Sequence, residues 1–259
     1  MKDQYFGDVD DYRKHGLLRE ILAWANVRLG VCWMLTAPDS RTDGGHLAYL
    51  DNPKKYRVFD CELFDWLQET MNRYPDRRTA QIEAAGLLPG AVYFAELLPD
   101  GHASRKAWFA GCRCKLAACD LVFFDPDNGL ERSVAFGRRQ SHKFLYWAEV
   151  RKTFSAGASV LVYRHFPREA RAAYIERMAE RLQIETGAPA VFAFSTPHVV
   201  FLLAAQERHA ASFREVVLKL PLHWPEKEIM AWDVHRAPVP GLSKPPRALP
   251  STEPPAGSR

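Results

Sequence analysis

The sequence predicts an α/β fold: a Rossmann-like, doubly wound and mostly parallel sheet with helices on both faces. Two continuous apolar runs, at 120–124 and 158–163, have the length and composition of buried central strands. Amphipathic helical patterns lie between and around them, most clearly at 10–24 and 168–186. Strands that alternate with helices along a chain form such a sheet, because each helix carries the chain back across it.

Composition and length favour one globular domain over residues 1–235. The chain has 259 residues, of which 47% are hydrophobic and 25% charged. No apolar run approaches the roughly 18 residues of a membrane span, and the first residues lack the apolar segment of a secretory signal. We therefore expect a cytoplasmic protein without membrane contact. Residues 236–259 contain seven prolines and few large apolar side chains, which predicts a disordered tail.

The net charge and the cysteines bear on three questions: a nucleic-acid partner, disulfide bonds and a zinc site. The net charge of +4 permits RNA or DNA as a partner without requiring it. The five cysteines form no even disulfide framework, and free thiols are expected in a reducing compartment. The cluster at 112–119 has a spacing that is untypical of zinc sites.

In the first half of the chain, the helix at 10–24 opens with acidic residues and carries an apolar stripe at helical spacing. A short apolar run at 29–35 predicts a strand, and the polar, glycine-containing stretch at 38–45 predicts a loop of functional length. Further elements are expected at 61–73 and 77–86, which read as helices, and at 91–94, which reads as a strand.

In the second half of the chain, predicted strands and helices alternate more regularly. The strand at 120–124 is the clearest in the sequence, and the strand at 158–163 follows a helix predicted at 143–154. Beyond the helix at 168–186, two more strands are expected, at 190–195 and 198–205. Trp33, Trp147 and Trp224 fit core or helix-packing positions.

The expected chemical centre follows the strand at 120–124. Asp125 stands one residue past this strand, and residues 125–131 hold three carboxylates, an amide side chain and a glycine. Ligands of open α/β sheets bind at the carboxyl ends of the strands. One interpretation is a pocket in which Asp125 accepts hydrogen bonds from an amino group and orients it.

Two other interpretations of this segment stay open. Asp125, Asp127 and Glu131 offer the oxygen ligands that Mg²⁺ prefers, and Lys143 or His165 would assist such a site. Alternatively, the Asp-Asn-Gly sequence forms an Asx-type turn that only caps the next element.

The stretch from Arg113 to Trp224 resembles the C-terminal half of the class I methyltransferases that modify an adenine N6 in 23S ribosomal RNA. Residues 124–128 match the strand-end Asp-Pro-Pro-Tyr loop of that family, and 161–167 are similar to its Trp-Tyr-Pro-like strand end. Its late hairpin, helix and closing Leu-His segment have counterparts in residues 190–223.

The N-terminal segment resembles the same family. The family pattern Gly-Asn-His-x-Asp-x-x-Lys-His is matched here by Gly7, Asp11, Lys14 and His15. The last three lie at i, i+3 and i+4 and therefore share one helix face. An ion-paired surface helix would carry the same residues.

The sequence departs from the family in two places. The glycine-rich cofactor loop is replaced by residues 35–45, a longer stretch whose glycines come late. In the catalytic loop, Asp127 and Asn128 stand where the family has a second proline and an aromatic residue. Phe123, Tyr163 and Phe166 are the nearby aromatic residues that offer stacking in its place.

The resemblance implies an S-adenosylmethionine-dependent methyltransferase that acts on an amino group, with a nucleic acid as the expected substrate. The residues it assigns are, for catalysis, Asp125, Asp127, Asn128, Lys14 and His15, and, for the cofactor, Asp11, Asp39, Asp43, Gly44 and Gly45. Tyr163, Arg164 and His165 follow a buried strand and are the expected substrate-binding residues. The alternatives are a Mg²⁺-dependent nuclease or phosphoryl-transfer enzyme and a catalytically inactive binding module.

Overall fold

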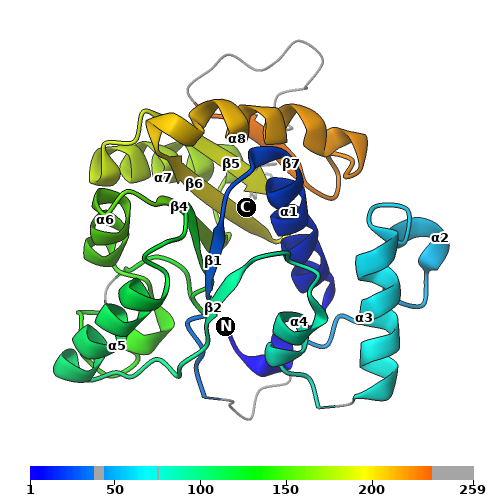
Figure 1. The fold of residues 1–259 in the computed structure, drawn as a ribbon, viewed down its shortest axis with the longest axis horizontal. Helices are drawn as coiled ribbons and strands as arrows, with labels where there is room; N and C mark the ends of the chain where they lie inside the picture. Colours follow the sequence, from blue (N-terminus) through cyan, green and yellow to red (C-terminus); the bar gives the residue numbers. More distant parts are fainter. Residues whose placement is uncertain (38–43, 75, 133, 235–259) are drawn as a thin grey trace, which may run out of the picture.

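A computed structural model describes residues 1–37, 44–74, 76–132 and 134–234 (Figure 1). Within these residues the chain builds one sheet in the order β2-β1-β3-β4-β6-β5-β7. The strands are β1 (Leu29–Cys32), β2 (Val92–Phe94), β3 (Leu121–Phe124), β4 (Ser159–His165), β5 (Ala190–Ser195), β6 (Val199–Ala205) and β7 (Met230–Asp233).

Helices and short helical turns connect the strands. The α-helices are α1 (Val9–Ala25), α2 (Pro53–Tyr56), α3 (Cys61–Arg73), α4 (Ala80–Ala85), α5 (His102–Lys115), α6 (Trp147–Ser155), α7 (Arg171–Thr186) and α8 (Glu207–Lys219). The 3₁₀ turns are η1 (Asp3–Tyr5), η2 (Ser141–Lys143) and η3 (Leu220–Leu222). None of the helices in the described residues is long and apolar enough to span a membrane.

The sheet has a parallel half and an antiparallel half. β2, β1, β3 and β4 pair in parallel, whereas β6 lies antiparallel between β4 and β5, and β7 closes that edge antiparallel to β5. β5 therefore runs in the same direction as β4. In the parallel half, all four strands end at the same edge of the sheet, so the segments that follow them meet there.

Helices cover both faces of the sheet (Figure 1). α1 and α8 pack together on one face, α3 lies against α1, and α5, α6 and α7 cover the other face. Strand residues alternate between the two cores: Phe123 and Leu161 belong to the α1 and α8 side, while Val122 and Val162 belong to the opposite side. The predicted α/β fold with helices on both faces is confirmed.

Most of the elements expected in the sequence are present, with shifted ends. The helix expected at 143–154 begins only at Trp147, because η2 occupies 141–143, and the helix expected at 168–186 begins at Arg171. The helix α5, the short helix α2 and the edge strand β7 were not predicted, nor were the 3₁₀ turns. Trp33, Trp147 and Trp224 are buried, as predicted. The cysteines are free thiols, and the tail at 236–259 lies outside the described residues.

Candidate active site

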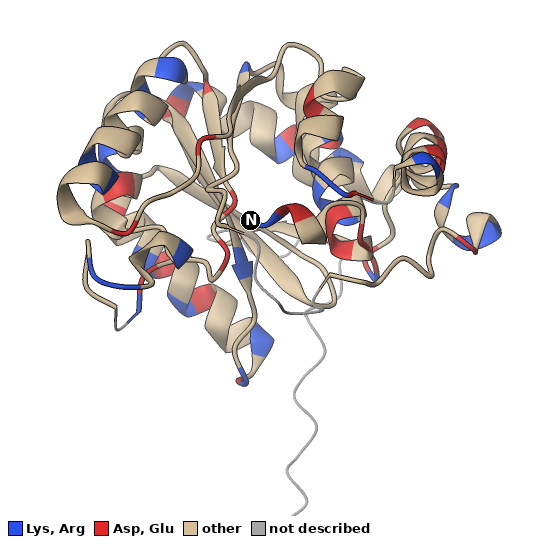
Figure 2. Ribbon diagram, turned by 90° about the horizontal axis from the view of Figure 1, so that it is seen from below, with Lys and Arg blue, Asp and Glu red and all other residues tan. Residues whose placement is uncertain are grey.

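A cavity of about 330 Å³ lies at the carboxyl edge of the parallel strands. The loop after β3, the end of β4, the start of α1 and the N-terminal residues contribute its walls. Its lining consists of Met1, Tyr5, Asp8, Asp10, Asp11, Lys14, Gly44, His46, Asp125, Pro126, Asp127, Asn128, Tyr163 and His165. Acidic segments lie on both sides of the N-terminus in Figure 2.

Asp125 leaves β3 directly at this edge. Its backbone N–H donates to the Cys32 carbonyl at the end of β1 over 3.1 Å, which prolongs the parallel pairing by one residue. The following loop is fixed by the Asn128 N–H, which donates to the Lys143 carbonyl over 2.8 Å. The Asp125 side chain is 2% exposed, so its carboxylate must find partners inside the protein.

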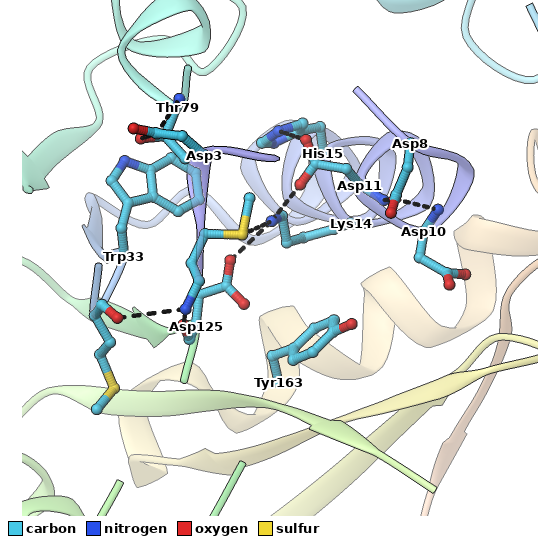
Figure 3. A network of polar contacts seen from close by, with 12 residues as sticks. Asp3, Asp8, Asp10, Asp11, Lys14, His15, Trp33, Thr79, Asp125 and Tyr163 are labelled. Carbon is cyan, nitrogen blue, oxygen red and sulfur yellow. Dashed lines mark hydrogen bonds and ion pairs between the residues drawn. The ribbon is translucent and has the colours of Figure 1, made fainter. Parts of the chain in front are cut away.

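Helix α1 brings those partners. The Asp8 carboxylate caps the helix by accepting hydrogen bonds from the backbone N–H groups of Asp10 and Asp11. One turn later, the Lys14 ammonium donates to Asp125 Oδ2 over 2.8 Å and also pairs with Asp11. Figure 3 shows Lys14 between the two carboxylates. Asp11 Oδ2 also accepts a hydrogen bond from the Gly7 N–H and lies 3.2 Å from His15 Nε2.

These contacts shift the proton affinities of the acidic and basic groups. Burial disfavours the charge of Asp11, but Lys14 and His15 outweigh it and lower the pKa of that carboxyl group. Burial likewise opposes the charge of Lys14, yet Asp11 and Asp125 raise its pKa. Burial, reinforced by the neighbouring Asp11 carboxylate, raises the pKa of Asp8 to about 7. The Asp8 carboxyl group can therefore take up or release a proton near neutral pH.

The N-terminal residues complete one wall. The ammonium group of Met1 donates to the backbone carbonyl of Asp125 over 2.8 Å and to that of Met34 over 3.3 Å. Lys2 Nζ lies 3.6 Å from Asp127 Oδ2. The residues that precede α1 are thus held against the loop after β3.

Tyr163 and His165 form the wall contributed by β4. The Tyr163 hydroxyl group lies 3.5 Å from His165 Nε2. Burial, followed by the nearby Asp125 charge, raises the pKa of Tyr163 well above its usual range. Burial lowers the pKa of His165, which favours the neutral imidazole. This wall is therefore uncharged at neutral pH and presents an aromatic ring to the acidic wall of α1.

The structure brings most of the sequence-predicted residues to the cavity. Those that line it are Asp11, Lys14, Gly44, Asp125, Asp127, Asn128, Tyr163 and His165. His15 lies one contact away, through Asp11, and Gly45 follows the lining residue Gly44 without lining the cavity itself. Asp39 and Asp43 lie outside the described residues. Of the aromatic residues considered for stacking, only Tyr163 lines the cavity.

Two of the predicted residues do not reach the cavity. Arg164 points to the opposite face of the sheet from Tyr163, where its guanidinium donates to the Leu130 carbonyl over 3.1 Å. Glu131 does not join Asp125 and Asp127, because its side chain accepts a hydrogen bond from the Trp147 N–H at the start of α6. Among the described residues, no group of three or more His, Cys, Asp or Glu is arranged to hold a metal ion.

Sequence reasoning missed Asp8, Asp10 and His46 as cavity residues. Asp8 carried a usable signal, since an aspartate directly before a helix is a typical N-cap and a cap at the carboxyl edge of a sheet faces the site. His46 follows a loop whose course the sequence does not reveal. No protein-family profile matches the chain, and no curated protein sequence matches it at a significant level.

Proposed function

We propose that the chain is an S-adenosylmethionine-dependent methyltransferase that acts on an amino group, with a nucleic acid as its substrate. The observation that carries the proposal is the contact between Lys14 and Asp125. In this acidic cavity, an amino group already donates to the strand-end carboxylate over 2.8 Å. The same carboxylate oxygen can accept a hydrogen bond from a substrate amino group.

Lys14 has a second carboxylate partner, Asp11, so a substrate amine can replace its contact with Asp125. Its ammonium group pairs with Asp11 as well as with Asp125. When a substrate amine donates to Asp125, Lys14 keeps the Asp11 carboxylate and is not left as an unpaired buried charge. Asp125 would then orient the amine, and Lys14 would remain paired with Asp11.

Two other cavity residues suit the remaining steps. Methylation of an amine releases a proton, and the Asp8 carboxyl group, whose pKa is about 7, can accept it near neutral pH. The Tyr163 ring lines the cavity opposite α1 and offers a surface on which a planar base can stack.

The charge of the cavity fits the methyl donor. When bound, S-adenosylmethionine supplies an electrophilic methyl group on a positively charged sulfur. Five aspartates line the cavity, whereas Lys14 is the only Lys or Arg among its described lining residues. Asp11, Gly44 and Gly45 are the described residues that the family resemblance assigns to the donor, and the first two line the cavity. The β5 and β6 pairing is in line with the late hairpin of that family.

An assay of methyl transfer tests the proposal. Purified protein is incubated with S-adenosylmethionine that carries a labelled methyl group and with unmodified RNA and DNA oligonucleotides. Asp125→Ala is expected to lower turnover roughly 100-fold or more, because the amine loses the group that orients it. The variant should fold, because Lys14 retains Asp11.

Asp120→Ala is the matched control. Asp120 immediately precedes β3, at the opposite end from Asp125, and its side chain is 39% exposed. Its turnover should stay close to that of the unmodified chain. Equal turnover of Asp125→Ala and the unmodified chain would overturn the assignment.

A further inference from the structure

Arg164 is a buried cation that has no counter-ion among the described residues. It lies on β4 beside the cavity residue Tyr163, is 4% exposed, and forms no ion pair within the part of the chain that the structure describes. One guanidinium nitrogen donates to the Leu130 carbonyl over 3.1 Å, while Nε is buried and has no hydrogen-bond partner among the described residues. A buried donor without an acceptor lowers the stability of the fold, and a bound ligand that accepts its hydrogen bond would remove this cost.

Tyr174, next to Arg164, also has a buried polar group without a hydrogen-bond partner among the described residues. Its ring lies 5.4 Å from the guanidinium carbon of Arg164 and 5.4 Å from that of Arg177. Its hydroxyl group is also buried, without a hydrogen-bond partner in the described residues. Arg164 Nε and the Tyr174 hydroxyl group are thus both unpaired among the described residues, and the guanidinium groups of Arg164 and Arg177 both lie near the Tyr174 ring.

The surrounding charges are mainly positive. Burial, followed by the positive charges of Arg132 and Arg177, lowers the pKa of Arg164 to about 10. The nearby carboxylate, Glu169, already forms two hydrogen bonds with Arg177, of 2.8 and 2.9 Å. Three arginines against one glutamate leave a local charge of +2. This balance matches a phosphate group better than a carboxylate, and the planar guanidinium binds phosphate oxygens in pairs.

The arginine cluster adjoins the candidate active site through its loop. A Cβ atom on Gly129 would lie 2.8 Å from Arg164 Cγ, and Gly129 has a φ of +79°, so only glycine lets the loop rest on the arginine stem. Asn128, the preceding residue, lines the cavity. A group bound at Arg164 would therefore sit beside the loop that carries Asp125.

We infer that Arg164, together with Arg132 and Arg177, forms a phosphate-binding site beside the candidate active site. The site takes a phosphate group, either of a free phosphorylated molecule or of a nucleic-acid strand. It goes beyond the proposed methyl transfer, since phosphate binding requires no methyl donor. It also explains how an acidic cavity would tolerate a polyanionic substrate, because the phosphates would bind to the arginines and the base would enter the cavity.

Thermal unfolding with inorganic phosphate as the probe tests the site. The full chain is melted without methyl donor, in phosphate and in chloride at equal ionic strength. Phosphate should raise the melting temperature through its binding to the folded state. Arg164→Met should remove this rise and should still fold in chloride, since it replaces an unpaired buried charge with an apolar side chain.

Two further variants keep the test decisive. Arg181→Met is the control, because Arg181 also stacks on an aromatic ring, Trp147, but its side chain is 57% exposed and it pairs with Glu185. It should respond to phosphate like the unmodified chain. Arg177→Met leaves Arg164 in place and should weaken phosphate binding roughly tenfold, as expected for the loss of one charge-assisted contact.

A single-stranded RNA oligonucleotide distinguishes the two sources of phosphate. If a strand is the ligand, Arg164→Met should reduce the slope of log affinity against log salt by about one. If the slope is unchanged while the phosphate effect is lost, the site belongs to a free phosphorylated molecule. A phosphate effect that is absent from the unmodified chain, or equal in Arg164→Met, would overturn the inference. Both results are independent of methyl transfer.

Discussion

Lys14 contacts two carboxylates that the chain supplies from distant segments. Asp11 comes from the same helix, and Asp125 lies 111 residues further along the sequence. All three side chains are almost completely buried. Removal of Lys14 would leave two buried carboxylates without their cation, so its role in stability cannot be separated from its role in the site by a Lys14 substitution alone. Asp125 is the better probe of chemistry.

Asp8 gives the site a pH dependence. Because its pKa is about 7 in the folded state and about 3.9 in an unfolded chain, the folded state binds the proton more tightly between these values. Its contribution to stability therefore falls as the pH rises from about 4 to 7, and the penalty is complete above 7. Asp8→Asn keeps a capping side chain but cannot ionise.

Urea unfolding at several pH values measures this effect. Asp8→Asn should be more stable than the unmodified chain at pH 8.5, by a free energy on the order of 1–3 kcal/mol, and the difference should shrink towards zero near pH 4. A difference that is the same at all pH values would show that Asp8 does not titrate in this range.

At the residue scale, the sequence predicts where a residue lies along a strand or helix better than it predicts the direction in which its side chain points. Asp125 could be predicted because it directly follows a buried strand, and Asp11 and Lys14 because helical spacing puts them on one face. Arg164 could not, since adjacent strand residues point to opposite faces and its neighbour Tyr163 takes the cavity side. Glu131 shares the Asp125 segment, but the turn at Gly129 directs it to α6.

At the element scale, α5 illustrates why a helix can escape detection. Its buried positions, Arg105, Trp108, Phe109 and Cys112, follow helical spacing. The first of them is an arginine, and the remaining stretch contains a glycine and two cysteines, so the apolar pattern is short. β7 was not predicted for another reason. It is an edge strand of four residues, and all but one of them are half-buried, so it lacks the apolar run of a buried strand.

Arg105 has a structural role that only the fold reveals. It is fully buried, forms two hydrogen bonds with Glu149 of α6, of 2.7 and 2.8 Å, and donates to the carbonyls of Ser141 and Phe144. It therefore ties α5 to α6 and to the segment that follows the active-site loop.

Arg105→Met is expected to destabilise the fold by about 3–5 kcal/mol, because Glu149 is left as an unpaired buried charge. The double variant Arg105→Met, Glu149→Leu should recover a large part of this loss. Denaturation curves of the single and double variants measure both quantities. If the double variant is no more stable than Arg105→Met, the ion pair is not the source of the effect.

At the scale of the whole molecule, the parallel half of the sheet explains how the site is assembled. Segments near residues 8–14, 125–128 and 163–165 meet because β1, β3 and β4 end at one edge and α1 packs beside them. The alternation of strands and helices predicted this arrangement. The antiparallel order of β6, β5 and β7 did not follow from it, because strand order depends on long-range pairing that local patterns do not encode.

The measurement that tests the central claim most directly is isothermal titration of the chain with S-adenosylmethionine in EDTA, followed by titration with S-adenosylhomocysteine. We predict saturable binding in the micromolar range without a divalent metal. The positively charged donor should bind severalfold more tightly than its neutral product, because five aspartates line the cavity. No binding heat in EDTA, with heat only after Mg²⁺ is added, would contradict the account and favour a metal-dependent enzyme.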